Sequence, residues 1–241
     1  MRATTKGRNP RSAVQPGETL LREVDHRLRH RYGLSRLGNK DDPLDELIFI
    51  ILSAKTQEST YTAAFDALKA RFSSWDDASH ASSEEIEAVI RFAGLSIKKS
   101  RALAGLLSAV VSRVASADLT FLRGEDDLAA YRFLRDLPGV GPKSARCVLS
   151  YSLGRAAFAV DAHVSRIVRR LGWSSHHRLT ERVQDDIQAL VPPEIRLSLH
   201  VNLVNLGRSV CTERSPACQL CVLADLCPSA FRVGAGGLHA T

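Results

Sequence analysis

Long apolar runs are missing from this 241-residue chain. No stretch approaches the roughly 18 consecutive apolar residues of a membrane-spanning helix, so we expect a soluble protein. Sustained alternation of apolar and polar residues between hairpin turns is also missing, which argues against a β-sheet. Internal repeats are absent as well, which leaves no indication of a repeat architecture.

Acidic residues are missing from residues 1–17, which carry the basic side chains Arg2, Lys6, Arg8 and Arg11. This stretch has no amphipathic apolar face and contains prolines, so we expect a disordered basic arm rather than a transit peptide. The glycine-containing tail at 229–241 is also expected to be disordered. The whole chain has a formal net charge of +7, which favours a polyanionic partner, although solvated surface charge alone can give such a balance.

Cysteine is scarce, but four of the five cysteines lie within seventeen residues with the spacing C-x6-C-x2-C-x5-C. They are Cys211, Cys218, Cys221 and Cys227. Thiolates this close in sequence can bind one metal centre. A secreted protein would use its cysteines as disulfides, so bunched cysteines without a signal peptide indicate a metal site in a reducing, cytoplasmic compartment. The fifth, Cys147, lies in an apolar helical pattern and is expected to be a buried thiol.

Apolar residues recur at helical spacing along most of the chain, which predicts an all-α protein. Asp42 followed by Pro43 predicts the start of a helix. Ser82 and Glu85 form a capping box at another start, and Gly94 suits the end of that helix. Further apolar stripes predict helices that include residues 103–114, 128–134, 164–171, 183–190 and 199–204.

A glycine-rich turn, Leu-Pro-Gly-Val-Gly-Pro-Lys at 137–143, separates two of these helical patterns. Gly139 and Gly141 allow positive φ and leave backbone amides unshielded, and Pro142 suits the first position of the next helix. Such a turn can hold a phosphate, although an ordinary corner between helices has the same features. Lys143 opposes the helix dipole, which is unfavourable for a structural lysine. The same field, with partial burial, would lower the pKa of its amine and favour a nucleophile.

A second candidate is Asp161, in the segment Val-Asp-Ala-His at 160–163. It begins an apolar-periodic helix, so its role can be that of an N-cap contributing about 1 kcal/mol. A cap is also fixed in orientation, which a catalytic carboxylate requires. One helix and a short connection separate it from Lys143, a spacing that permits the two to meet. His163 and His200 are interpreted as hydrogen-bonded packing residues.

Taken in order, the 137–143 turn, the Val160–His163 segment and the cysteine spacing resemble the endonuclease III family of helix-hairpin-helix (HhH-GPD) DNA glycosylases. The resemblance covers residues 20–228. It implies an all-α, two-domain fold with a cleft between the domains. A six-helix barrel over 36–155 would carry the hairpin, and an iron–sulfur domain would combine 18–35 with 156–228.

The resemblance also implies a base-excision-repair enzyme acting on double-stranded DNA with a damaged base. Lys143 aligns with the family's nucleophile and Asp161 with its catalytic carboxylate. This implies a monomeric, bifunctional DNA glycosylase and AP lyase for oxidised or saturated pyrimidines, located in the cytoplasm with the nucleoid. The four cysteines would hold a 4Fe–4S cluster, with structural zinc as the alternative. Two other functions stay open: a nearly inactive or non-catalytic DNA-binding module, and a mismatch-specific glycosylase.

The expected DNA contacts are the hairpin residues Leu137, Gly139, Val140 and Gly141 together with two further segments. Where the family has Leu-Ser-x-Gln-Thr, this chain reads Leu-Ser-Ala-Lys-Thr-Gln at 52–57. The family glutamine fills the gap left by a flipped nucleotide. Lys55 cannot accept a hydrogen bond and would seek a phosphate or a base acceptor edge, with Gln57 as a candidate substitute. In the other segment, Leu95 matches the family's apolar wedge, with a helix-end packing contact as the alternative.

Lys99, with its neighbours Lys98 and Arg101, is expected to reach phosphates or to form a solvated helix face. Two departures from the family weaken phosphate binding. Pro142 stands where an arginine is common and removes an amide donor. The loop after Cys211, usually basic, has one cation offset by one acid. We therefore expect narrowed or altered substrate use.

Overall fold

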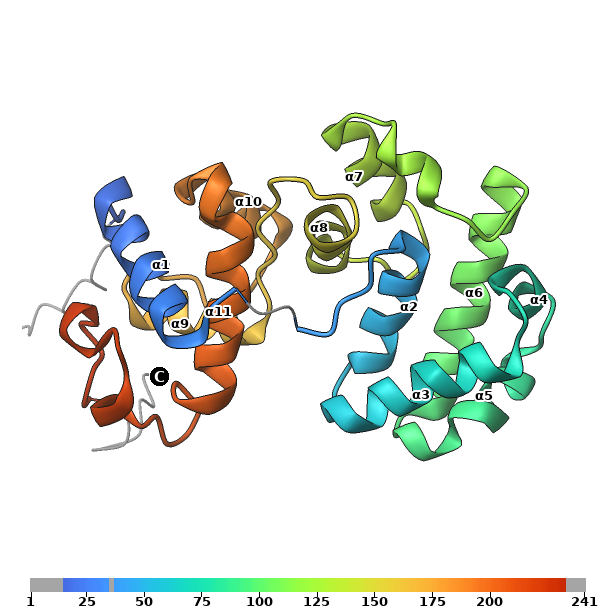
Figure 1. Cartoon of the computed structure of the whole chain (residues 1–241), viewed down its shortest axis with the longest axis horizontal. Coiled ribbons are helices and arrows are strands. Elements are labelled where there is room, and N and C mark those ends of the chain that lie inside the picture. Colours follow the sequence, from blue (N-terminus) through green and yellow to red (C-terminus); the bar gives the residue numbers. More distant parts are fainter. Residues whose placement is uncertain (1–14, 35–36, 233–241) are drawn as a thin grey trace, which may run out of the picture. The chain divides into compact units, whose positions relative to one another are not determined.

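The computed structural model of the protein describes residues 15–34 and 37–232, and these residues form helices and connecting turns without a strand (Figure 1). The all-α prediction is therefore confirmed. No helix within the described ranges has the length and apolarity needed to cross a bilayer. The predicted disordered arm and tail lie largely outside the described residues.

The chain divides into two compact units. We call Arg36–Ala159 the hairpin unit, and Met1–Ser35 with Val160–Thr241 the cysteine unit. The helices of the hairpin unit are α2 (Pro43–Ser53), α3 (Glu58–Arg71), α4 (Trp75–Ser79), α5 (Ser83–Ile90), α6 (Ser96–Val114), α7 (Asp127–Arg135) and α8 (Pro142–Tyr151), with 3₁₀ turns at Arg91–Ala93 and Thr120–Arg123. Those of the cysteine unit are α1 (Glu18–Tyr32), α9 (Ala162–Arg170), α10 (Glu181–Leu190) and α11 (Arg196–Ser209), with 3₁₀ turns at Pro193–Ile195, Cys218–Leu220 and Ala224–Leu226.

The helix starts that were predicted within the hairpin unit are all present. The Asp42 carboxylate accepts hydrogen bonds from the amides of Leu44 and Asp45, both at 2.9 Å. Ser82 and Glu85 form the reciprocal capping box. Such caps satisfy amides that have no partner inside the helix, and each contributes about 1 kcal/mol.

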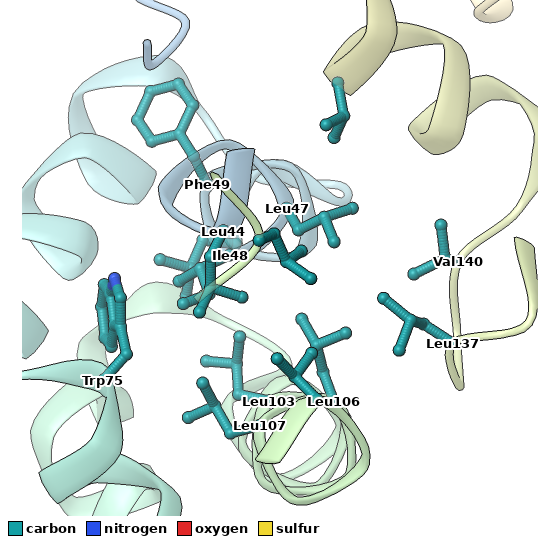
Figure 2. Packing of buried hydrophobic residues seen from close by; sticks show 14 of the residues in the cluster. Leu44, Leu47, Ile48, Phe49, Trp75, Leu103, Leu106, Leu107, Leu137 and Val140 are labelled. Atoms are coloured by element: carbon teal, nitrogen blue, oxygen red, sulfur yellow. The ribbon is translucent and has the colours of Figure 1, made fainter. Parts of the chain in front are cut away.

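One continuous apolar core holds the hairpin unit together (Figure 2). Its centre combines Leu44 and Ile48 of α2 with Leu103 and Leu106 of α6, all essentially inaccessible to solvent. Each such side chain contributes about 1.5–3 kcal/mol through its burial. Helices α2 and α8 also lie against each other.

In the cysteine unit, α11 packs against both α1 and α9. The contact with α9 depends on Gly207, because a Cβ atom there would lie 2.7 Å from the Cβ of His163. His163 accepts a 3.0 Å hydrogen bond from Arg166 Nη2, and His200 is buried. Both histidines therefore lie in packed surroundings, and Cys147 in the hairpin unit is buried as predicted.

Candidate DNA-binding and catalytic site

The 137–143 turn connects α7 to α8 and is anchored by two apolar side chains. Leu137 and Val140 are 2% and 4% exposed, belong to the core, and point toward the side where Leu106 lies (Figure 2). The Val140 amide closes the turn on the Leu137 carbonyl at 3.2 Å. Because both side chains are committed to the core, only the backbone of these two residues can meet DNA.

The exposed tip of this turn contains Gly139, which has φ = 78°. Side chains other than glycine rarely adopt that conformation, so this glycine is required by the turn. Gly141 differs from expectation: its φ of −84° and ψ of 172° are ordinary extended values, and it serves as the N-cap residue of α8. Pro142 occupies the first helical position as predicted.

Lys143 lies in the first turn of α8 and is half-buried. A carboxylate missed by the sequence analysis interacts with it: Glu46 of α2, whose exposed fraction is 0%. Glu46 accepts hydrogen bonds from the Lys40 amide at 2.8 Å and from the Asn39 side chain. Burial raises the pKa of Glu46 to about 7, against the opposing effects of these hydrogen bonds and of the Lys143 and Lys40 charges.

The remaining candidates of this unit lie on two turns. The Lys55 turn, residues 54–57, joins α2 to α3, and both Lys55 and Gln57 are exposed on it. The Leu95 turn, residues 93–95, precedes α6, and the Leu95 side chain is 52% exposed. All three residues thus present their side chains to solvent, as a DNA contact requires.

Lys99 differs from expectation, because it is 3% exposed and points into the protein. Its ammonium group donates to the hydroxyl of Thr56 and, at 3.0 Å, to the carbonyl oxygen of Ala93. Burial lowers the pKa of Lys99. In this conformation the ammonium group contacts the Lys55 and Leu95 turns rather than the solvent from which a phosphate would approach.

Asp161 belongs to the cysteine unit, where it caps α9. Its carboxylate accepts a 2.8 Å hydrogen bond from the Val164 amide, and the side chain is half-buried. The cap function predicted for this residue is therefore present. It fixes the orientation of a carboxylate at the surface of α9.

The four clustered cysteines line one small cavity of about 30 Å³ together with Arg170 and Pro216. None of them forms a disulfide. Burial raises the pKa of the Cys221 and Cys227 thiols, and the neighbouring cysteines raise it further. Among the described residues, no group of three or more His, Cys, Asp or Glu side chains is arranged to hold a single metal ion.

Three arginines hold the cysteine-bearing loop against the helices. Arg170 of α9 donates to Cys211 Sγ at 3.0 Å and to the Thr212 carbonyl at 2.7 Å. Arg166 donates to the Cys211 carbonyl at 2.9 Å, and Arg27 of α1 binds the Asp225 carboxylate with distances of 2.7 and 2.9 Å. The role of these arginines was not predicted from the sequence, since basic side chains near a helix end are common on solvated surfaces.

Comparison with known proteins identifies the family. A family model described as the HhH-GPD superfamily of base excision DNA repair proteins matches residues 48–193. The chain belongs to this superfamily. Endonuclease III of Synechocystis is 30% identical over 191 residues, which cover 78% of this chain and 82% of that protein. A relative from Arabidopsis thaliana is 34% identical over 169 residues, covering 70% of this chain and 58% of that protein.

Two solved structures share the fold with a TM-score of 0.77 each, and each match covers 90% of this chain and 98% of the other. One is a non-covalent endonuclease III–DNA complex at 26% identity. The other is a trapped covalent endonuclease III–DNA intermediate with an estranged adenine, at 25% identity. The predicted endonuclease III-like fold and family are therefore confirmed, and the chain is a DNA glycosylase of base excision repair.

Proposed function

We propose that this glycosylase is bifunctional, removing oxidised or saturated pyrimidines from duplex DNA and then cleaving the strand as an AP lyase. The observation that carries the proposal is Lys143, half-buried in the first turn of α8 directly after the glycine turn. An amine next to exposed backbone amides can reach a sugar whose phosphates those amides bind. The covalent DNA intermediate trapped for a structural relative supports such chemistry.

The proposed reaction begins when the damaged nucleotide leaves the base stack, because C1′ is otherwise out of reach. The Lys143 amine attacks C1′ and forms a carbon–nitrogen bond. The N-glycosidic bond breaks, and the base leaves with its electron pair and takes up a proton. The sugar ring then opens to an imine between C1′ and Lys143.

Strand cleavage follows from that imine. A base removes a proton from C2′, and the C3′–O bond breaks, so the 3′ phosphate leaves with its electron pair. Water then hydrolyses the imine and releases the Lys143 amine. Asp161, held as the cap of α9, supplies a fixed negative charge that stabilises the positive charge developing on the sugar.

For DNA recognition, we assign the backbone of the 137–141 turn to a phosphate and the exposed Lys55, Gln57 and Leu95 to the distorted duplex. An exposed leucine can wedge into a kinked duplex. Lys55 brings a cation in place of the family glutamine, so it favours base edges rich in acceptors. We propose that the protein binds DNA as a monomer.

We further propose that Cys211, Cys218, Cys221 and Cys227 hold a 4Fe–4S cluster. The residues fit such a group, because all four cysteines line one cavity and none is used in a disulfide. When bound, the cluster supplies positive iron charge, which offsets the repulsion among four neighbouring thiolates and fixes the loop. Arg27, Arg166 and Arg170 position that loop against α1 and α9.

The proposal is tested by adding borohydride while the protein acts on duplex DNA that carries thymine glycol. Borohydride converts an imine into a stable amine, so wild-type protein should give a covalent protein–DNA adduct. Lys143→Ala should give none. Lys69→Ala is the matched control, because it also removes a lysine from the hairpin unit but outside the proposed site. Lys69 lies on α3, where it forms a 3.3 Å ion pair with Asp45.

The same experiment on a duplex with an abasic site separates the lyase step from base recognition. An adduct on the abasic site but not on thymine glycol would assign another damaged base as substrate. If wild-type protein binds the abasic duplex and still forms no adduct, the bifunctional mechanism is wrong.

A further inference from the structure

The two turns proposed to meet DNA share an unusual backbone conformation. Lys55 has φ = 51° and Leu95 has φ = 54°, both in the left-handed region. For residues with a Cβ this conformation is strained, and it persists where surrounding contacts enforce it. The side chains on both turns thus depend on contacts that hold the backbone in place.

One buried side chain contacts both turns, that of Lys99 in the first turn of α6. Its ammonium group donates to the Thr56 hydroxyl in the Lys55 turn and to the Ala93 carbonyl in the Leu95 turn. Its amide donates to the Leu95 carbonyl at 2.9 Å. The Thr56 hydroxyl itself lies 3.3 Å from the Ala93 carbonyl oxygen. We call Lys99, Thr56 and Ala93 the turn clamp.

The chemistry of the clamp is unfavourable for stability alone. Lys99 is 3% exposed, and the two partners of its ammonium group are a hydroxyl and a carbonyl, which carry no formal charge. Taking an ammonium ion out of water is unfavourable, and neutral hydrogen-bond partners offset only part of the lost hydration. An apolar side chain of the same length would fill the position with less penalty. A buried lysine here is therefore explained better by what it orders than by the stability it adds.

We infer that Lys99 is a positioning residue that couples the Lys55 turn to the Leu95 turn, so that both turns engage the duplex as one unit. The inference rests on the proposed function, because it assigns DNA contacts to Lys55 and Leu95. The inference goes beyond that function by giving a buried side chain control over base extrusion. Lys99 itself touches neither substrate nor the reacting atoms.

The test uses Lys99→Met, Thr56→Val and the double variant, with Thr56→Ser as the matched control that keeps the hydroxyl. Methionine keeps an unbranched side chain, one heavy atom shorter than that of lysine, and carries no charge. We expect Lys99→Met to unfold at a urea concentration equal to or higher than that of wild type. Excision on a lesion-bearing duplex should fall by up to about 100-fold, the loss typical of misplaced positioning elements.

A second readout separates positioning from general damage. Cleavage of an abasic site in single-stranded DNA, which needs no extrusion from a duplex, should stay within a factor of about 2 of wild type for all variants. The fluorescence rise of 2-aminopurine beside an abasic analogue, which reports unstacking in the duplex, should shrink in Lys99→Met and Thr56→Val. The double variant should lose no more excision activity than the worse single variant, because the two substitutions remove the same contact.

The inference is overturned if folded Lys99→Met excises duplex lesions as fast as wild type, or if the losses in the two single variants multiply. If Lys99→Met does not fold, the comparison of Thr56→Val with Thr56→Ser still decides, because equal activity of these two would overturn it. Failure of the proposed function has a different signature, since wild-type protein itself would then neither excise the lesion nor cleave the abasic site.

Discussion

Glu46 and Lys143 interact electrostatically inside the hairpin unit, and the positive charge of Lys143 lowers a Glu46 pKa that burial raises. The net result is a Glu46 pKa of about 7, compared with 4.5 for an exposed glutamate. The carboxyl group is fully buried and shares its oxygens between the Lys40 amide and the Asn39 side chain. It therefore changes charge near neutral pH beside the proposed nucleophile.

This relationship predicts that the contribution of Glu46 to the free energy of unfolding falls as pH rises from about 4.5 to about 7. Between these values the unfolded chain has released the Glu46 proton while the folded chain still holds it, so the folded state binds more protons. Stability is then fully present below the unfolded pKa and falls as pH passes through the folded pKa. The loss amounts to about 3 kcal/mol, from 1.36 kcal/mol per pKa unit.

Urea unfolding of wild type and Glu46→Gln at pH 5 and pH 8 measures this effect. Glutamine is neutral at both values, so Glu46→Gln should lack the Glu46 part of the decline. Glu84→Gln serves as the control, because Glu84 is exposed in the first turn of α5 and its variant should keep the wild-type decline. Parallel declines in wild type and Glu46→Gln would contradict the assignment.

The same pair predicts a shift in the pH dependence of borohydride trapping. Above pH 7 the ionised Glu46 favours the protonated, non-nucleophilic form of Lys143. Glu46→Gln removes that negative charge, so the pH at which trapping reaches half its maximum should fall. A curve that stays in place, in a variant that folds normally, would show that Glu46 does not influence the nucleophile.

Local signals in the sequence predicted the helix starts well. The caps at Asp42, Ser82 and Asp161 depend only on residues within one turn, and all are present. The glycine turn was placed correctly for the same reason, since Gly139 adopts the positive φ that its residue type permits. The family followed from the order of three such local motifs.

Burial of charged residues was not predictable from those signals. Lys99 was expected at a solvated or phosphate-binding face, yet its ammonium group bonds to Thr56, 43 positions away in the sequence. Glu46 lies in the first turn of α2, where acidic residues are common, so its burial leaves no sign in the sequence, and its neighbours Lys40 and Lys143 come from a loop and from α8. Contacts between distant segments decide such cases, and helical periodicity alone does not report them.

The proposed cluster predicts the metal content of the protein. Protein purified without oxygen should contain about four iron and four sulfide per chain. Cys221→Ser should lose iron and unfold at a lower urea concentration, because a cavity-lining thiolate is removed. Cys147→Ser should keep its iron, since Cys147 is buried in the other unit. One zinc per chain and no sulfide would replace the cluster with a structural zinc site.

The two roles of Asp161 can be separated by substitution, because asparagine caps a helix about as well as aspartate but carries no charge. Asp161→Asn should keep the 2.8 Å hydrogen bond to the Val164 amide and the wild-type stability, while excision slows by about 100-fold or more. Asp161→Ala should show the same slowing and also lose about 1 kcal/mol of unfolding free energy. Single-turnover excision and urea unfolding measure the two effects. Excision by Asp161→Asn at the wild-type rate would reduce Asp161 to a helix cap.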